Sequence, residues 1–95
     1  MTLMRHSQFK IGLDFWCGDR RFRCTDVGGR VVVAIRIDAA EVTTMFNVQA
    51  RSHRLTGADA EAQGLFVGPP YAVAEVVFDE DDLGACFIER AEAAL

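Results

Sequence analysis

The sequence predicts a small α+β or mostly-β domain, in which a small antiparallel sheet curls toward an SH3-like or open barrel and a helix follows at the C-terminus. Three observations lead to this prediction. The segment 9–38 combines alternating apolar residues with a continuous apolar run and is interrupted by two glycine-containing turns, and apolar residues alternate again along 71–78. After position 82 the apolar residues recur at helical spacing instead.

The segment 9–38 is expected to form three consecutive antiparallel strands with turns at Gly18–Asp19 and Gly28–Gly29. Its first strand places apolar side chains at every second position, namely Phe9, Ile11, Leu13 and Phe15. Two adjacent glycines favour a type I′ turn, because glycine adopts positive φ without steric cost. The third strand, 30–37, is apolar on both faces up to Arg36, so we expect it to be the most buried of the three.

The middle of the chain carries weaker signals. A strand is expected over 41–48, because its threonines and valines favour extended backbone. The polar stretch 51–64 predicts a mobile connecting loop, although Gly57–Gln63 has the composition of one helical turn. The alternation along 71–78 predicts a strand that carries Glu75 on an otherwise apolar face.

The C-terminal segment predicts a helix over 82–94. Apolar side chains recur there at every fourth position, namely Leu83, Phe87, Ala91 and Leu95. Asp79 is suited to the N-cap, and the acidic run 79–82 complements the positive end of the helix dipole. Residues 1–8 follow neither period and are expected to be a frayed leader of a single domain that spans 1–95.

The composition is that of a folded globular chain. Of the 95 residues 51% are hydrophobic, which argues against disorder. No apolar run approaches the roughly 20 residues needed to span a bilayer, and the N-terminus lacks the apolar region of a signal peptide. We therefore expect a cytoplasmic protein with no membrane partner.

The net charge of −4 hides an asymmetry between the two halves of the chain. Residues 1–54 carry nine basic and five acidic side chains, whereas residues 55–95 carry one basic and nine acidic side chains. This distribution indicates a basic face with an acidic appendage. It differs from the uniform basicity of a dedicated nucleic-acid-binding protein.

A basic sheet face is the first candidate binding surface. The predicted second strand, 21–26, and the end of the third strand place three arginines near Trp16, namely Arg21, Arg23 and Arg36. Basic side chains beside an aromatic ring suit single-stranded nucleic acid, through phosphate contacts and base stacking. The alternative, which the negative net charge favours, is a solvated face whose arginines pair with Asp14, Glu75 or the acidic helix.

A second candidate surface combines Trp16 and Tyr71 in an aromatic patch of the kind that binds extended peptides. Packing in the core or at its rim is the alternative for both rings. The exposure of the two rings distinguishes these interpretations.

Metal and redox chemistry have weak signals. Cys17 and Cys24 lie on neighbouring predicted strands, where they could form a cross-strand disulfide or half of a soft-metal site. The alternative is that both are buried thiols. Together with Cys86 the chain has an odd number of cysteines. We favour buried thiols. The acidic run 79–82 lacks the spacing of an EF-hand, and helix capping accounts for it. We predict no metal and no other cofactor.

Catalysis is not predicted. His6 and His53 lie far apart without an evident nucleophile, and the chain has no nucleophile elbow, P-loop, dinucleotide-binding or zinc-protease motif. The favoured interpretation is a small non-catalytic interaction or accessory module, which binds a protein partner or forms a homodimer through a sheet edge or the C-terminal helix. The alternative is a nucleic-acid-binding small barrel that uses the basic sheet face.

Two segments, Arg23–Asp38 (RCTDVGGRVVVAIRID) and Gly68–Asp82 (GPPYAVAEVVFDEDD), resemble short bacterial proteins of unknown function. Together they cover about a third of the chain. The resemblance implies a bacterial cytosolic protein. It implies no activity and no catalytic residues, so it transfers no site to this sequence.

Overall fold

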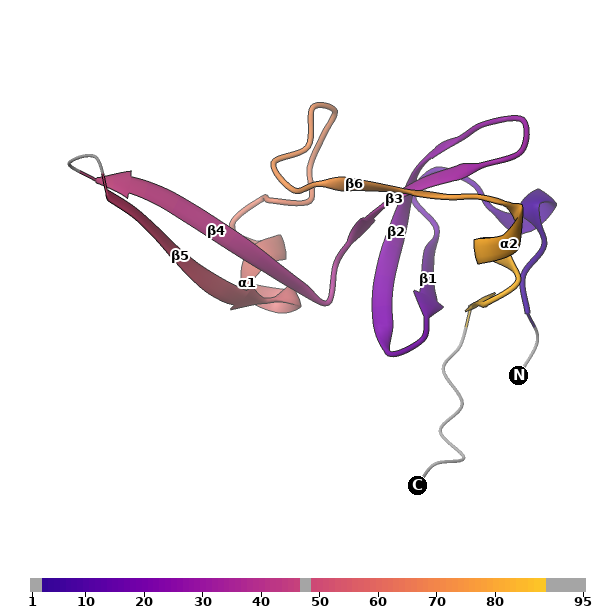
Figure 1. The fold of residues 1–95 in the computed structure, drawn as a ribbon, viewed down its shortest axis with the longest axis horizontal. Helices are drawn as coiled ribbons and strands as arrows, with labels where there is room; N and C mark the ends of the chain where they lie inside the picture. The colour runs from indigo at the N-terminus through magenta and orange to yellow at the C-terminus, as the bar shows by residue number, and fades with distance from the viewer. Residues whose placement is uncertain (1–2, 47–48, 89–95) are drawn as a thin grey trace, which may run out of the picture.

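The computed structural model describes residues 3–46 and 49–88, which form a mostly-β fold with two sheets (Figure 1). The larger is an antiparallel sheet with the strand order β6-β3-β2-β1-β7. Its strands are β1 (Asp14–Cys17), β2 (Arg20–Val27), β3 (Val32–Arg36), β6 (Glu75–Phe78) and β7 (Cys86–Phe87). The smaller is a ribbon of β4 (Ala39–Phe46) and β5 (Gln49–Thr56), and the helical turns are η1 (His6–Gln8), α1 (Gly57–Ala62) and α2 (Glu80–Leu83). Within the described chain β6 and β7 stay unpaired with each other at opposite edges, so the sheet forms no closed barrel.

The predicted meander of three strands is confirmed, and its second turn differs from the prediction. β1 pairs with β2 through a turn in which Gly18 has a φ of 65°. At the β2–β3 connection neither Gly28 nor Gly29 has positive φ, so the predicted type I′ turn is wrong. The Gly28 amide instead donates to the Val31 carbonyl at 2.9 Å. β3 is the most buried strand, as predicted, with three wholly buried side chains: Val32, Ala34 and Ile35.

The first strand begins at Asp14, five residues later than the alternation predicts. The Leu13 amide donates to the Lys10 carbonyl at 3.0 Å, and Gly12 has a φ of 92°. This turn breaks the alternation, because it reverses the chain before the strand starts. The side chain of Ile11 is consequently 67% exposed, and the prediction that it faces the core is wrong.

Two clusters of buried side chains lie on opposite faces of the five-stranded sheet. Ala34 and Ile35 of β3 belong to different clusters, because successive side chains of a strand point to opposite faces. The first cluster is built around four phenylalanine rings with centroids 5.0–5.8 Å apart in four pairs, namely Phe9, Phe15, Phe22 and Phe78. The second contains Ile35, Ile37, Ala40, Ala60 and Phe66, and it places α1 on this side of the sheet.

The ribbon of β4 and β5 extends from the sheet as an arm (Figure 1). The principal extents of 48 × 37 × 21 Å and the radius of gyration of 14.8 Å reflect this arm. A compact domain of this length has a radius of gyration of about 12 Å. The short helix α1 contacts both strands of the ribbon, and its buried residue Ala60 joins the second cluster.

The prediction of a connecting loop over 51–64 is wrong. Residues 51–56 belong to β5, and Gly57–Ala62 forms α1, whose N-cap Thr56 accepts a hydrogen bond from the Asp59 amide at 3.1 Å. Polar composition favours a loop locally, but β4 supplies backbone partners along the whole of β5. The strand predicted over 41–48 is β4, and residues 47–48 lie outside the described residues.

The N-terminal segment packs on the sheet where a frayed leader was expected. Met4 is 5% exposed and its amide donates to the carbonyl of Cys86 at 2.9 Å. Leu3 forms an antiparallel bridge with Phe87. The prediction fails for residues 3–8, because Leu3 and Met4 pair with β7 and residues 6–8 form η1, whose His6 ring is hydrogen-bonded to the Gly28 carbonyl. Residues 1–2 lie outside the described residues.

Of the predicted helix over 82–94, only Asp82 and Leu83 are helical, residues 84–88 are not, and residues 89–95 lie outside the described residues. α2 ends at Leu83, and Cys86–Phe87 pairs with β1 as β7. The predicted N-cap is confirmed, since the Asp79 carboxylate accepts from the amides of Asp81 and Asp82 at 2.9 and 3.1 Å. Leu83 and Phe87 are buried as a helical stripe would require, but Leu83 ends α2 and Phe87 belongs to β7. No helix in the described part of the chain is long and apolar enough to cross a bilayer.

The predicted strand over 71–78 is shorter than expected. Only Glu75–Phe78 pairs with β3, in a register that places Glu75 opposite Ile35 and Phe78 opposite Val32. Residues 71–74 lie beyond the end of the pairing, whose last pair joins Ile35 to Glu75. β6 thereby becomes a short edge strand of the five-stranded sheet.

Candidate protein-interaction surface

The arginines of the predicted basic face do not share one face. Trp16 lies directly opposite Arg21, and Arg23 follows two residues later in β2, so these three side chains project from the same side. Arg36 lies opposite Phe22, whose ring faces the first core cluster. Arg36 therefore projects from the other side, and its predicted place beside Arg21 and Arg23 is wrong. The β2–β3 register decides this, and the sequence does not reveal that register.

The side of Trp16 carries a compensated network of charges. Arg23 donates to both oxygens of Asp14 at 2.7 and 3.2 Å and to Glu61 at 3.2 Å. The Asp14 hydrogen bond is the main cause of the raised pKa of Arg23. Arg21 lies 3.5 Å from the same carboxylate and 5.8 Å from the centre of the Trp16 ring. The interpretation that Asp14 neutralises these arginines is confirmed.

Arg36 is compensated as well. Its guanidinium donates to both carboxylate oxygens of Asp38 at 2.7 and 2.9 Å. This fork-shaped contact is the main reason why the pKa of Asp38 is lowered from its ordinary value of 3.8. The same contact raises the pKa of Arg36.

The lowered pKa of Asp38 predicts a loss of stability in acid. The unfolded chain binds the Asp38 proton at higher pH than the folded chain does, so this contribution is complete above the ordinary carboxyl pKa and declines as the pH falls below about 3.8. In urea unfolding at several pH values, Asp38→Asn is expected to flatten the fall in stability between about pH 4 and pH 2. Arg36→Gln should flatten it in the same way, and an unchanged slope in both variants would contradict the prediction.

A groove of about 490 Å³ lies between the base of the ribbon and residues 72–76. Its charged lining consists of Arg20, Arg36, Arg54 and Glu41, and alanine and valine side chains of residues 39–40 and 72–76 supply the apolar lining. Arg20 and Arg54 form no ion pair with any residue that the structure describes. The groove therefore places beside an apolar wall two guanidinium groups that have no ion pair among the described residues, and Glu41 lies opposite Arg54 in the ribbon.

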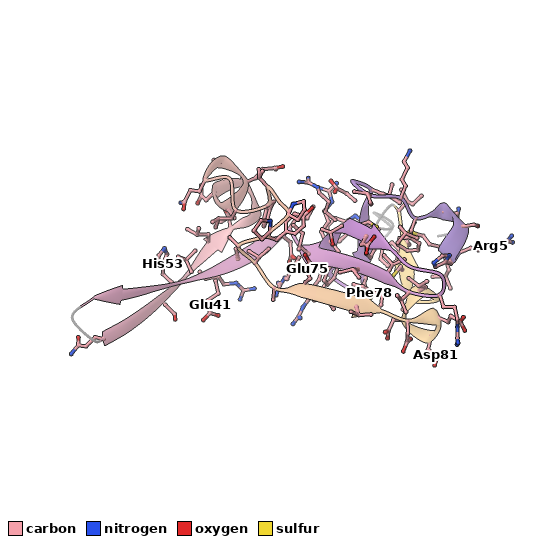
Figure 2. All side chains as sticks on the ribbon, turned by 90° about the horizontal axis from the view of Figure 1, so that it is seen from above. Arg5, Glu41, His53, Glu75, Phe78 and Asp81 are labelled. Carbon is pink, nitrogen blue, oxygen red and sulfur yellow. The ribbon has the colours of Figure 1, made fainter. Side chains whose placement is uncertain are left out.

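The outer edge of β6 adjoins this groove through Val76. Figure 2 shows Glu75 at the end of β6 near the ribbon and Phe78 at the end near α2. Val76 and Val77, between them, are 41% and 59% exposed and project from opposite faces. No described strand pairs with this edge. Backbone N–H and C=O groups along such an edge are available to another strand.

Tyr71 is half-buried and packs against the second core cluster. Packing at the rim of the core is the alternative that the aromatic-patch interpretation left open for this ring. Trp16 is also half-buried and lies beside Arg21. Both aromatic side chains thus have intramolecular contacts, which reduces the surface that they offer to a peptide.

The cysteines and acidic residues form no evident metal site. Cys17 lies opposite Arg20 and Cys24 opposite Ala34, so the suggested cross-strand pair of Cys17 and Cys24 does not occur. The acidic run 79–82 caps α2, as predicted. In residues 3–46 and 49–88 no group of three or more potential His, Cys, Asp or Glu ligands comes together.

The sequence analysis does not identify the groove arginines Arg20 and Arg54 or the exposed edge of β6 as parts of a binding surface. Arg20 borders a turn, and Arg54 lies in the stretch expected to be a loop, so neither has a distinctive local pattern. Only the formation of β5 brings Arg54 to the groove. The exposed valines of β6 have the alternating pattern of any half-buried strand, and their place at an edge follows from strand order alone.

Comparison with known proteins adds no family to this description. A scan of protein-family models, a search of curated proteins and a search of solved structures each returned no match. The resemblance of segments 23–38 and 68–82 to short bacterial proteins therefore stays a prediction. The binding properties of the surface have to be inferred from its own residues.

Proposed function

We propose that this protein is a non-catalytic interaction module that binds an extended segment of a partner polypeptide along the outer edge of β6. The unpaired β6 edge with two exposed valines carries this proposal. A strand added to such an edge gains backbone hydrogen bonds, and pockets beside the edge select its side chains.

The β6 strand has few of the features that usually prevent an edge strand from pairing with another chain. Strand edges are commonly blocked by lysine, proline, a bulge or a covering helix. The sequence Glu75–Phe78 contains neither lysine nor proline, and its pairing with β3 has no irregularity. Glu75 is the only charged side chain of this strand, and it is placed at one end. The middle of the strand therefore supports the binding of another strand.

The groove beside Val76 complements this edge. A strand that runs along β6 passes the groove, where Arg20 and Arg54 have no ion-pair partner among the described residues. Backbone pairing provides the affinity for a partner strand, and the groove selects among the side chains of that strand. A partner polypeptide with a suitable side chain at that point is favoured over an arbitrary strand.

The nucleic-acid alternative has less support. It requires Arg21, Arg23 and Arg36 on one uncompensated face, but Asp14, Asp38 and Glu61 neutralise these arginines and Arg36 lies on the other side of the sheet. Guanidinium groups bind nucleic acid by neutralising phosphates and displacing the counterions of those phosphates, and the observed ion pairs compete with these phosphate contacts.

The test is a selection of random twelve-residue peptides displayed on phage, followed by affinity measurements with the enriched peptides. Val77→Lys is expected to weaken binding at least about tenfold, because a charged side chain on an edge strand opposes strand addition. Val67→Lys is the matched control, since Val67 is 75% exposed and outside β6, and it should change affinity less than about twofold.

Light scattering on the same variants identifies the case in which the partner strand comes from a second copy. Self-association that is lost in Val77→Lys and kept in Val67→Lys would support edge pairing between copies. A chain that enriches no peptide and stays monomeric would overturn the proposal. Equal peptide affinity in both lysine variants would overturn it as well.

A further inference from the structure

Two cysteines that are far apart in the sequence face each other at the sheet edge opposite β6. Cys17 of β1 lies directly opposite Cys86 of β7. Cys86 is fully buried and Cys17 is half-buried, and both contact the first core cluster. The neighbouring Cys17 sulfur contributes to the raised pKa of Cys86. The Cys86 thiol donates to the Asp82 carbonyl at 3.5 Å, and the Cys24 thiol donates to the Asp26 carbonyl at 3.5 Å.

The register brings these two cysteines close to disulfide geometry. Directly opposed residues of antiparallel strands hold their Cβ atoms about 4.5–5.5 Å apart, and a disulfide requires about 3.5–4.5 Å. A movement of roughly 1 Å closes this gap. β7 is suited to such a movement, because it consists of Cys86 and Phe87 alone and, among the described residues, pairs on its far side only with Leu3 and Met4.

We propose that Cys17 and Cys86 form a reversible disulfide, whose formation fastens β7 to β1. In a reducing compartment both residues rest as thiols, which is the state of this structure. A slightly strained disulfide is easier to reduce than a relaxed one, which favours reversibility. This redox pair is independent of the β6 edge, since it lies at the other edge of the sheet.

Cys17 is the attacking group of the pair. Burial, followed by the neighbouring Cys17 sulfur, raises the pKa of Cys86 to about 12, so Cys86 keeps its proton at neutral pH. Cys17 is the more accessible of the two and reaches solvent. A dissolved oxidant reaches the accessible thiol first, so oxidation begins at the Cys17 sulfur.

The oxidant is a small disulfide such as oxidised glutathione. The Cys17 thiolate attacks one of its sulfurs, forms a mixed disulfide and expels one glutathione thiolate. The Cys86 sulfur loses its proton and attacks the Cys17 sulfur, which forms the protein disulfide and expels the second glutathione thiolate. The two expelled thiolates take up the two protons released by the protein. The two protein thiols thus lose two electrons in total, and one glutathione disulfide gains them and is reduced to two thiols.

The test is to equilibrate the full chain with oxidised and reduced glutathione at several ratios and to alkylate the remaining thiols in urea with N-ethylmaleimide. The chain has three cysteines, so the reduced protein takes up three labels and the oxidised protein only one. Trypsin cleaves after Arg20 and Arg23 and separates Cys17, Cys24 and Cys86 into different peptides. The expected product is a Cys17–Cys86 cross-linked peptide with Cys24 labelled.

Cys24→Ser is the matched control, because Cys24 is as buried as Cys86 but faces no other cysteine. It should still form the cross-link, whereas Cys17→Ser should keep both remaining thiols. Oxidation should raise the melting temperature by about 5 °C or more in the wild type and leave it unchanged in Cys17→Ser. Retention of three labels in oxidised glutathione, or a disulfide that involves Cys24 or a second chain, would overturn the proposal.

Discussion

Replacing Phe15 with alanine is expected to lower the free energy of unfolding by about 3–5 kcal/mol, the typical cost of truncating a fully buried phenylalanine. Phe15 is wholly buried, and its ring contacts three others, with centroid distances of 5.0 Å to Phe9, 5.8 Å to Phe22 and 5.4 Å to Phe78. These rings come from the N-terminal segment, β2 and β6, so the resulting cavity affects distant parts of the first cluster. Domains of this size are stable by only about 5–15 kcal/mol in total.

Urea unfolding followed by Trp16 fluorescence and circular dichroism measures this cost. Ile11→Ala is the matched control, because both positions belong to the same predicted apolar stripe but Ile11 is 67% exposed. The control should cost less than about 0.5 kcal/mol. Similar costs in the two variants would show that the first cluster is not centred on Phe15.

Replacing Gly57 with alanine is the second change with a large expected effect. Gly57 begins α1, and its amide donates to the Asp38 carbonyl at 3.0 Å. A methyl group at this position would collide with the Ile37 carbonyl oxygen and approach the Asp38 Cα to 3.1 Å. The obstacle is backbone, which cannot rotate away as a side chain can. We expect a loss of about 1–3 kcal/mol and a displacement of α1 from the second cluster.

Urea unfolding and amide hydrogen exchange together measure this effect. Gly29→Ala is the control, because no atom lies within 4 Å of the added methyl group and the φ of Gly29 is not positive. Exchange should increase in β4, β5 and α1 before it increases in β2 and β3, since a two-stranded ribbon is only marginally stable without support. Equal stability of the two alanine variants, or uniform exchange across both sheets, would contradict the prediction.

Local sequence predicted the elements whose partners are close in the chain. The hairpin of β1 and β2 follows from alternation and from Gly18–Asp19, and the burial of β3 follows from its apolar run. The Asp79 N-cap also depends only on its neighbours. In these cases the residues that decide the structure lie within a few positions of each other, so their pattern is sufficient.

Elements that depend on a distant partner were predicted less well. Cys86–Phe87 becomes a strand because β1 has an edge available, although its own apolar spacing favours a helix. Residues 51–56 become a strand because β4 pairs with them. The same dependence affects the candidate surface, since Arg36 was assigned to the wrong face and Arg20 and Arg54 were not recognised as neighbours.

The sequence alone predicted a small β-rich domain, because the period of its apolar residues and the placement of its glycines are local properties that select strands and turns. The tertiary structure alone decided strand order and register. These assign each side chain to a face and each strand to the middle or edge of the sheet. They place β6 at an open edge and bring Cys17 opposite Cys86, across most of the length of the chain. The physical reason is that strand pairing joins backbone groups whatever their separation in sequence, so no local pattern records it.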